Sequence, residues 1–312
     1  MNNNRVNIPI SSGVLLILIS TLGFSLYPIL GKYVFAGGAG LATVLFVRFT
    51  IAALFFWIIT IMREGFPRLT LKIWLILWGM GGICYSLMAG LYLSSVQYIP
   101  ASLAALLLYA FPIIVTVFAV VTHQETFSRF KFLGLLLSTT GLVLLLALGV
   151  VLDDINTHGV ALALGSACVY ATYIIIGNQV LQTTTPLVTI TLISTSAALT
   201  YGIVGFTMSG MTWNVTLTTW LGMGGIALFS TIIAMLTFFY GMKLIGAPSA
   251  SIISTLEPLL TVIFAVILFG EHITLLQAIG GILVVIGAIV TTLSPPLSVM
   301  QEINPFKKVG RE

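Results

Sequence analysis

Charged residues are scarce in this chain: aspartate, glutamate, lysine and arginine together make up 6% of its 312 residues. Soluble domains carry roughly a quarter charged residues, so this composition excludes an ordinary soluble protein. Hydrophobic residues instead make up 59% of the chain, and the mean hydropathy is +1.16. Apolar stretches of about 20 residues satisfy their backbone polar groups in lipid as helices, and they are too long for barrel strands. The sequence therefore predicts an all-α membrane protein.

Cysteine and histidine are also rare, and neither type is arranged for chemistry. Cys84 and Cys168 each lie inside an apolar stretch, which indicates packing and not a disulfide framework. His123, His158 and His272 fall at the ends of expected spans and are dispersed over both faces of the membrane. The sequence contains no nucleophile elbow, aspartate dyad, metal-spaced His/Cys cluster or phosphate loop. We therefore expect neither an enzyme nor a bound metal or cofactor.

Ten apolar stretches are long enough to cross a bilayer as helices. Glycine, proline and charged residues separate them, which supports the count. The expected spans are 12–34, 40–62, 73–96, 100–122 and 130–148 in the first half, and 158–180, 187–208, 218–242, 247–269 and 275–293 in the second.

The two halves of the chain are copies of each other. An offset of 146 residues aligns them without a gap, and the coinciding residues are mainly those that shape helices. The aligned pairs include Gly13 with Gly159, Tyr27 with Tyr173, Pro112 with Pro258, Glu125 with Glu271, Gly134 with Gly280 and Gly141 with Gly287. Each copy contains an odd number of spans, so the copies must lie in opposite orientations in the bilayer, as in many transporters. The predicted fold is ten transmembrane helices in two inverted five-helix repeats.

Positive charges give the expected orientation, because lysine and arginine near helix ends stay mainly on the cytoplasmic side. With the N-terminus inside, Lys32 lies near the outer end of its span and ten other positive residues fall inside. These ten are Arg5, Arg63, Arg68, Lys72, Arg129, Lys131, Lys243, Lys307, Lys308 and Arg311. The net charge of +4 therefore reflects membrane topology and not a nucleic-acid partner. We expect a multi-pass protein of the plasma membrane with both termini in the cytoplasm.

Three segments are expected along the chain. The first repeat occupies 1–150, the second occupies 151–295, and a basic cytoplasmic tail occupies 296–312. The tail carries three positive charges, which is fewer than clusters that recruit anionic lipids usually have. We interpret it as a short solvated segment.

Short sequence strings occur in a fixed order, in the second and fourth spans of the first copy and in the fourth span of the second copy, with one string directly after each fourth span. In the first copy they are Phe46-Val47-Arg48-Phe49, Pro100-Ala101-Ser102, Phe111-Pro112 and Gln124-Glu125; in the second they are Ala247-Pro248-Ser249-Ala250, Glu257-Pro258 and Gly270-Glu271. In this order and register, they resemble the EamA branch of the drug/metabolite transporter superfamily over nearly the whole chain. The resemblance implies ten helices in two inverted repeats and export of amino acids, other metabolites or drugs.

Arg48 and Glu257 are intramembrane charges that the duplication does not repeat, since their counterparts are Ser194 and Phe111. A charge near the bilayer centre costs about 2.5–3.5 kcal/mol, so both should face protein, water or each other, and their similar depths allow a direct or water-bridged pair. One interpretation is structural: Arg48 bonds carbonyls or joins two helices, and Glu257 serves the kink at Pro258. The other is functional: one of them contacts substrate, or Glu257 exchanges a proton during transport, because a low dielectric favours its neutral form.

Five aromatic residues lie at similar depth near the middle of their spans: Tyr85, Tyr109, Phe111, Tyr170 and Tyr173. Around a cavity they would stack on a flat or apolar substrate while the phenols supply hydrogen bonds. Ordinary helix packing is the alternative interpretation.

The small polar residues of the ninth span supply a further candidate for substrate binding, Ser254, although hydroxyls in helices often bond back to their own backbone. The duplicated Pro112 and Pro258 indicate paired kinks, which would shape the two gates of an alternating-access cycle.

Together these features predict a carrier that moves a small organic solute across the bilayer by alternating access. Amino acids or related metabolites are the expected substrates, export is the direction that the resemblance implies, and proton coupling through Glu257 is an open option. A drug-efflux carrier is the alternative substrate class. A passive channel or lipid scramblase is the alternative mechanism, and it would conduct without saturation.

Overall fold

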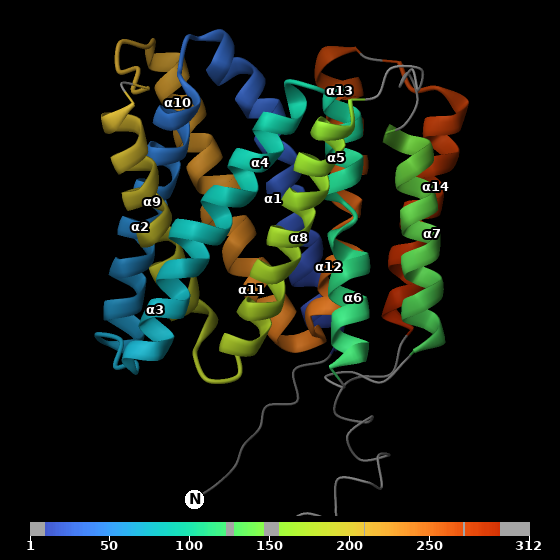
Figure 1. The fold of residues 1–312 in the computed structure, drawn as a ribbon, viewed down its shortest axis with the longest axis horizontal. Helices are drawn as coiled ribbons and strands as arrows, with labels where there is room; N and C mark the ends of the chain where they lie inside the picture. Colours follow the sequence, from blue (N-terminus) through green and yellow to red (C-terminus); the bar gives the residue numbers. More distant parts are fainter. Residues whose placement is uncertain (1–9, 123–127, 147–155, 209, 271, 294–312) are drawn as a thin grey trace, which may run out of the picture.

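The computed structural model describes residues 10–122, 128–146, 156–208, 210–270 and 272–293, which form helices joined by short loops (Figure 1). Ten helices within this part are long and apolar enough to cross a membrane. They are Ser11–Ala36, Leu41–Glu64, Leu71–Val96, Ala101–Val121, Arg129–Leu146, Thr157–Val180, Pro186–Thr207, Leu217–Ile245, Ala247–Phe269 and Leu275–Thr292. The expected number and order of spans are confirmed, and the ends differ by at most three residues. The repeated pair Glu125 and Glu271, His123 and the expected tail over 296–312 lie outside the described residues.

Six spans are continuous helices, and four are built from shorter segments. The continuous ones are α1 (Ile10–Ala36), α2 (Leu41–Glu64), α7 (Arg129–Leu146), α8 (Thr157–Val180), α9 (Pro186–Thr207) and α14 (Leu275–Thr292). The divided ones are α3 (Leu71–Gly79) with α4 (Ser86–Val96), α5 (Ala101–Leu108) with α6 (Phe111–Val121), α10 (Leu217–Ala227) with α11 (Ala234–Ile245), and α12 (Ala247–Ile253) with α13 (Leu256–Phe269). The divided spans are the third and fourth of each repeat, so the interruptions are duplicated with the sequence.

The fourth span of each repeat breaks just before its proline. The gap between α5 and α6 precedes Pro112, and the gap between α12 and α13 precedes Pro258. Proline has no backbone N–H, so it cannot donate the hydrogen bond that a helix interior requires. It is tolerated in the first turn of a helix, where the N–H groups have no intrahelical partner. The kinks expected at both prolines are therefore present as helix breaks, while their role as gates stays a prediction.

The third span of each repeat contains a π-helical segment that the sequence did not predict. Segment η1 (Met80–Tyr85) joins α3 to α4, and segment η2 (Leu228–Ile233) joins α10 to α11. A π turn contains an extra residue, so it changes the direction in which the following side chains point. These segments are frequent at functional sites.

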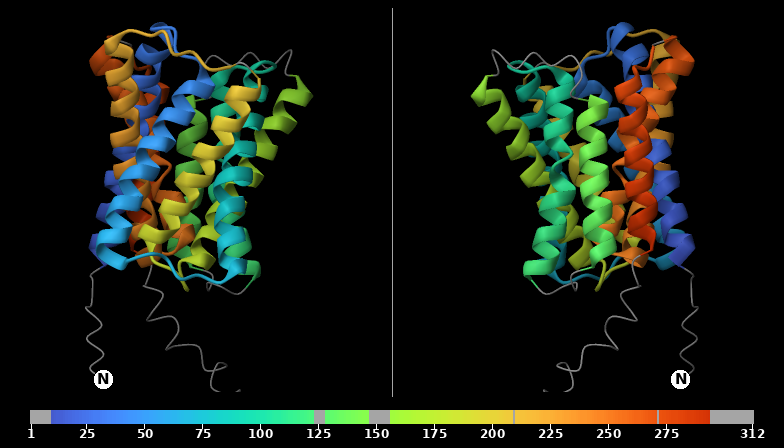
Figure 2. Two further views of the ribbon diagram at one scale, coloured as in Figure 1. Left: turned by 90° about the vertical axis from the view of Figure 1, so that its left-hand side faces the viewer. Right: turned by 90° about the vertical axis from the view of Figure 1, so that its right-hand side faces the viewer.

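The last spans of the two repeats, α7 and α14, lie side by side at one edge of the bundle (Figures 1 and 2). A Cβ added at Gly141 would lie 2.6 Å from the Gly280 carbonyl oxygen, and one at Gly280 would lie 2.6 Å from the Gly141 carbonyl oxygen. The same reciprocal contact, at 2.7 Å, joins Gly134 and Gly287. Because the 146-residue offset converts one glycine contact into the other, the two repeats are related here by a two-fold axis.

We expect Gly141→Ala to lower the melting temperature of the purified protein in detergent, because its methyl group would push α7 away from α14. Overpacking of this kind costs about 1–3 kcal/mol. Gly90→Ala is the matched control, since nothing lies within 4 Å of a Cβ at that position. Equal melting temperatures for both variants and the wild type would contradict the close helix approach.

Candidate functional site

Arg48 lies in α2 with its side chain enclosed by protein, since 2% of the residue is exposed. Its Nε donates a hydrogen bond to the Thr231 hydroxyl at 2.9 Å. Its Nη2 donates to the Tyr85 hydroxyl and to the Ser230 carbonyl oxygen, each at 3.4 Å. Tyr85 belongs to η1, whereas Ser230 and Thr231 belong to η2. Arg48 therefore connects the π-helical segments of the two repeats.

The π-helical geometry prepares η2 for this contact. The Thr231 hydroxyl donates to the Ile226 carbonyl five residues earlier, at 3.4 Å, which leaves its oxygen free to accept from Arg48. The Ser230 hydroxyl donates to the Gly23 carbonyl of α1 at 2.7 Å. Side chains of η2 thus bond both to Arg48 and to the neighbouring helix.

Two aromatic rings complete the surroundings of the Arg48 guanidinium group. Its Cζ lies 4.6 Å from the centre of the Tyr27 ring and 4.8 Å from the centre of the Phe49 ring. Both distances are within the range of cation–π attraction. The charge is therefore stabilised by hydrogen-bond acceptors and ring faces, and among the described residues it forms no ion pair with Glu257.

An aromatic row extends from Arg48 through the middle of the bundle. It consists of Phe49, Tyr85, Tyr173, Tyr170, Phe111 and Tyr109, with successive ring centres 5.1, 6.2, 6.1, 4.5 and 6.0 Å apart. All five aromatic residues selected from the sequence belong to the row. The sixth member, Phe49, was missed, although it adjoins Arg48 in the chain and its ring faces the guanidinium.

Members of the aromatic row differ in burial. Phe111 is 1% exposed and Tyr173 is 4% exposed, and Tyr173 also lies 6.1 Å from the Phe239 ring. Tyr85, Tyr109 and Tyr170 are half-buried. Packing explains the first two residues, whereas the three half-buried tyrosines are not fully covered by protein.

Glu257 lies in the first turn of α13, at the opposite end of the aromatic row, and it is half-buried. Its carboxyl group interacts with the Tyr109 phenol and, at longer range, with the charge of Arg48. Within the described part of the chain, no lysine, arginine or histidine forms an ion pair with it. The acidic residue of the site therefore has a phenol, and not a cation, beside it.

Ser254 lies at the break between α12 and α13, three residues before Glu257. It is 7% exposed, and its hydroxyl donates to the Ala250 carbonyl of its own helix at 2.8 Å. Its proton is thus used within α12, which leaves the oxygen lone pairs for any ligand.

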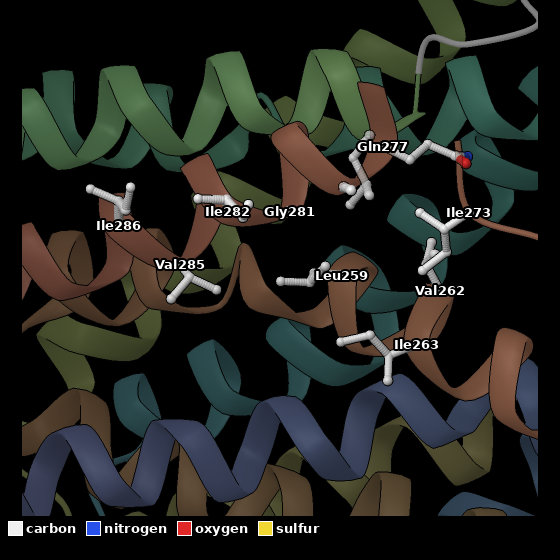
Figure 3. A pocket seen from close by; sticks show the side chains of 11 residues that line it. Leu259, Val262, Ile263, Ile273, Gln277, Gly281, Ile282, Val285 and Ile286 are labelled. Carbon is white, nitrogen blue, oxygen red and sulfur yellow. The ribbon is translucent and has the colours of Figure 1, made fainter. Parts of the chain in front are cut away.

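A separate groove of about 350 Å³ lies between α13 and α14, with Leu145 of α7 at its wall (Figure 3). Leu259, Val262, Ile282 and Val285 are among the aliphatic side chains that line it. Gln277 contributes a side-chain amide, but the amide oxygen accepts a hydrogen bond from the backbone N–H of Thr274 in the capping box of α14. The groove lacks the charge and aromatic rings of the Arg48–Glu257 region, so it does not suit a polar solute.

Comparison with known proteins places both halves of the chain in one family. The EamA-like transporter family matches residues 11–147 and again residues 157–293, which confirms the duplication. The chain is 27% identical over 254 residues to the uncharacterized transporter YyaM of Bacillus subtilis (strain 168), covering 78% of this chain and 81% of that protein. It is 27% identical over 281 residues to the uncharacterized transporter YcbK of the same organism, covering 86% and 89%.

An archaeal protein and a solved structure extend the comparison. An uncharacterized transporter of Archaeoglobus fulgidus is 28% identical over 203 residues, covering 64% of this chain and 70% of that protein. A crystal structure superposes with a TM-score of 0.79 at 21% identity, covering 90% of this chain and 98% of that one. At this identity the superposition supports the fold alone.

We expect Arg48→Gln to lower the melting temperature, because Tyr85, Ser230 and Thr231 would lose their shared donor. Leaving buried polar groups without partners costs about 1–3 kcal/mol. Arg63→Gln, at an exposed position near the end of the same helix, is the matched control and should leave the melting temperature unchanged. Similar behaviour of the two variants would contradict the bridging role of Arg48.

Proposed function

Since the chain belongs to the EamA-like transporter family, we propose that it is an alternating-access carrier that exports a small organic solute, with amino acids or related metabolites as substrates. The family match and the ten membrane-spanning helices make it a multi-pass membrane transporter. The proposal further places it in the plasma membrane with both termini in the cytoplasm, and assigns it no enzymatic activity. The observation that best supports alternating access is the unequal packing of the two repeats.

Equivalent segments of the two repeats are buried to different extents. All seven residues of α12 are buried, whereas in its counterpart α5 the buried residues are Leu103 and Ala104. In α11 seven residues are buried, whereas in its counterpart α4 the buried residue is Ser95. A molecule with the same packing at both membrane faces would bury equivalent segments equally. This difference is expected of a carrier that is closed on one side and more open on the other.

The well-packed segments α11 and α12 lie in the half of the bundle that contains the beginning of α1 (Figure 1). Here the position of Gly177 is surrounded by Met80, Phe239 and Met242, which lie 3.3 to 3.5 Å from where its Cβ would be. Its counterpart Gly31 has a single such neighbour, Phe35 of its own helix. The closer packing around Gly177 than around Gly31 supports the proposal that this half is the closed one.

Polar contacts also lie in this half. The Lys243 ammonium group donates to the Thr184 carbonyl at 2.9 Å, and the Thr185 hydroxyl donates to the Glu64 carboxylate at 2.6 Å. The distribution of positive charges supports placing this half at the cytoplasm. The proposed state is therefore outward-open, with Glu257 and the half-buried phenols within reach of the outer opening.

Alternating access requires that both states form around one site, and the broken fourth spans suit this requirement. Pro112 and Pro258 place a break in the middle of each of these spans, so the segments on either side can tilt separately. Glu257 lies directly after one of these breaks. A proton taken up by its carboxylate would change the charge beside the break, which is the proposed route of proton coupling.

Counterflow in proteoliposomes tests the proposed function. Vesicles preloaded with unlabelled amino acids should accumulate a labelled aromatic or branched neutral amino acid transiently and saturably. A channel or scramblase would instead give flux without saturation and without counterflow. Saturable counterflow of cationic drugs, with none for amino acids, would support the drug-efflux alternative and contradict the proposed substrates.

Glu257→Gln tests the proposed coupling in the same vesicles. We expect the variant to lose uptake driven by a pH gradient along with the pH dependence of transport. Counterflow needs no ion gradient, so it should remain when the solute is supplied at a saturating concentration. Glu64→Gln is the matched control, because it removes an exposed carboxylate outside the site while its amide oxygen can still accept from the Thr185 hydroxyl. Gradient-driven uptake and pH dependence that match the wild type would remove Glu257 from the coupling mechanism.

A further inference from the structure

The two intramembrane charges are not equally available to a ligand. Arg48 is 2% exposed, and its Nε and Nη2 groups already donate to Thr231 and Tyr85. Glu257 is half-buried and forms no ion pair with a basic residue of the described chain. The site therefore offers a carboxylate to a ligand, whereas its guanidinium is buried among protein groups.

The groups around Glu257 are also suited to a cation. Tyr109 lies beside its carboxyl group. The rings of Tyr170 and Phe111 follow, 4.5 Å apart. A carboxylate with aromatic residues nearby suits ammonium groups, because they can combine charge-assisted contact with cation–π attraction. An anionic ligand would instead meet the negative carboxylate without a free positive partner.

We propose that the substrate is recognised through a positively charged ammonium group. Glu257 binds this group, the aromatic row receives an apolar or aromatic body, and Arg48 does not hold a substrate carboxylate. The proposal rests on the carrier function and specifies its substrate class. Organic amines without a carboxylate are then substrates, and amino acids bind through their amino group.

Three compounds with the same phenyl group separate the possibilities. They are the cation trimethyl(2-phenylethyl)ammonium, the zwitterion phenylalanine and the anion 3-phenylpropanoate. The permanent charge of the first compound prevents passive diffusion through the bilayer. Binding is measured as the rise in melting temperature of the detergent-purified protein, and transport as inhibition and counterflow in proteoliposomes.

We expect the cation to raise the melting temperature at the lowest concentration, phenylalanine at a higher one, and 3-phenylpropanoate to have no effect. Glu257→Gln should require at least about tenfold more of the cation for the same shift, and Glu64→Gln should behave as the wild type. If Glu257→Gln does not fold, Glu257→Asp supplies the test, because its shorter carboxylate should weaken binding of the cation and leave the order of the three compounds unchanged.

The outcomes distinguish this inference from the proposed function. Counterflow of 3-phenylpropanoate, or wild-type binding of the cation by Glu257→Gln, would overturn the ammonium site while leaving the carrier intact. Binding of the cation that depends on Glu257, without saturable counterflow of any compound, would support the site and overturn the carrier.

Discussion

Arg48 carries a permanent charge inside a span, and the surrounding structure depends on how that charge is stabilised. Its donors bond to a phenol in η1 and to a hydroxyl and a carbonyl in η2. These segments belong to different repeats, so one side chain joins the third spans of both. The same bonds hold Tyr85 at the start of the aromatic row. An intramembrane arginine thus acts as a link between the repeats, and its stabilisation orders the central site.

Glu257, in contrast to Arg48, carries a charge that the surrounding protein does little to stabilise. The protein stabilises Arg48 with polar groups and ring faces, but it places a phenol and half-buried aromatic residues beside the carboxylate. A partly accessible carboxylate in a low dielectric is stabilised by a proton or by a bound cation. Proton coupling and ammonium recognition can therefore share one group, and each would displace the other. Its position at the break before α13 connects either event to movement of the ninth span.

Most of the fold could be predicted from the sequence, because hydropathy fixes the spans and a gapless duplication fixes their symmetry. The helix breaks followed from Pro112 and Pro258. The π-helical segments could not be predicted, since their geometry depends on tertiary bonds such as that between Thr231 and Arg48. At the site, Arg48 and Glu257 could be identified because neither charge is repeated in the other copy. Five aromatic residues could be identified because they lie near the middle of their spans. The burial and hydrogen-bond partners of Arg48 and Glu257 could not be predicted, because they depend on how the two repeats pack against each other.

The central claim is that one half of the bundle is closed while its counterpart is open, and that the two exchange during transport. In a variant without Cys84 and Cys168, single cysteines at the equivalent positions Tyr92 and Phe238 test it most directly. Tyr92 is half-buried and Phe238 is 4% exposed. A membrane-impermeant maleimide should label Tyr92→Cys from outside much faster than it labels Phe238→Cys from inside, and a transported solute should reduce this difference. Equal labelling with and without solute would contradict the account.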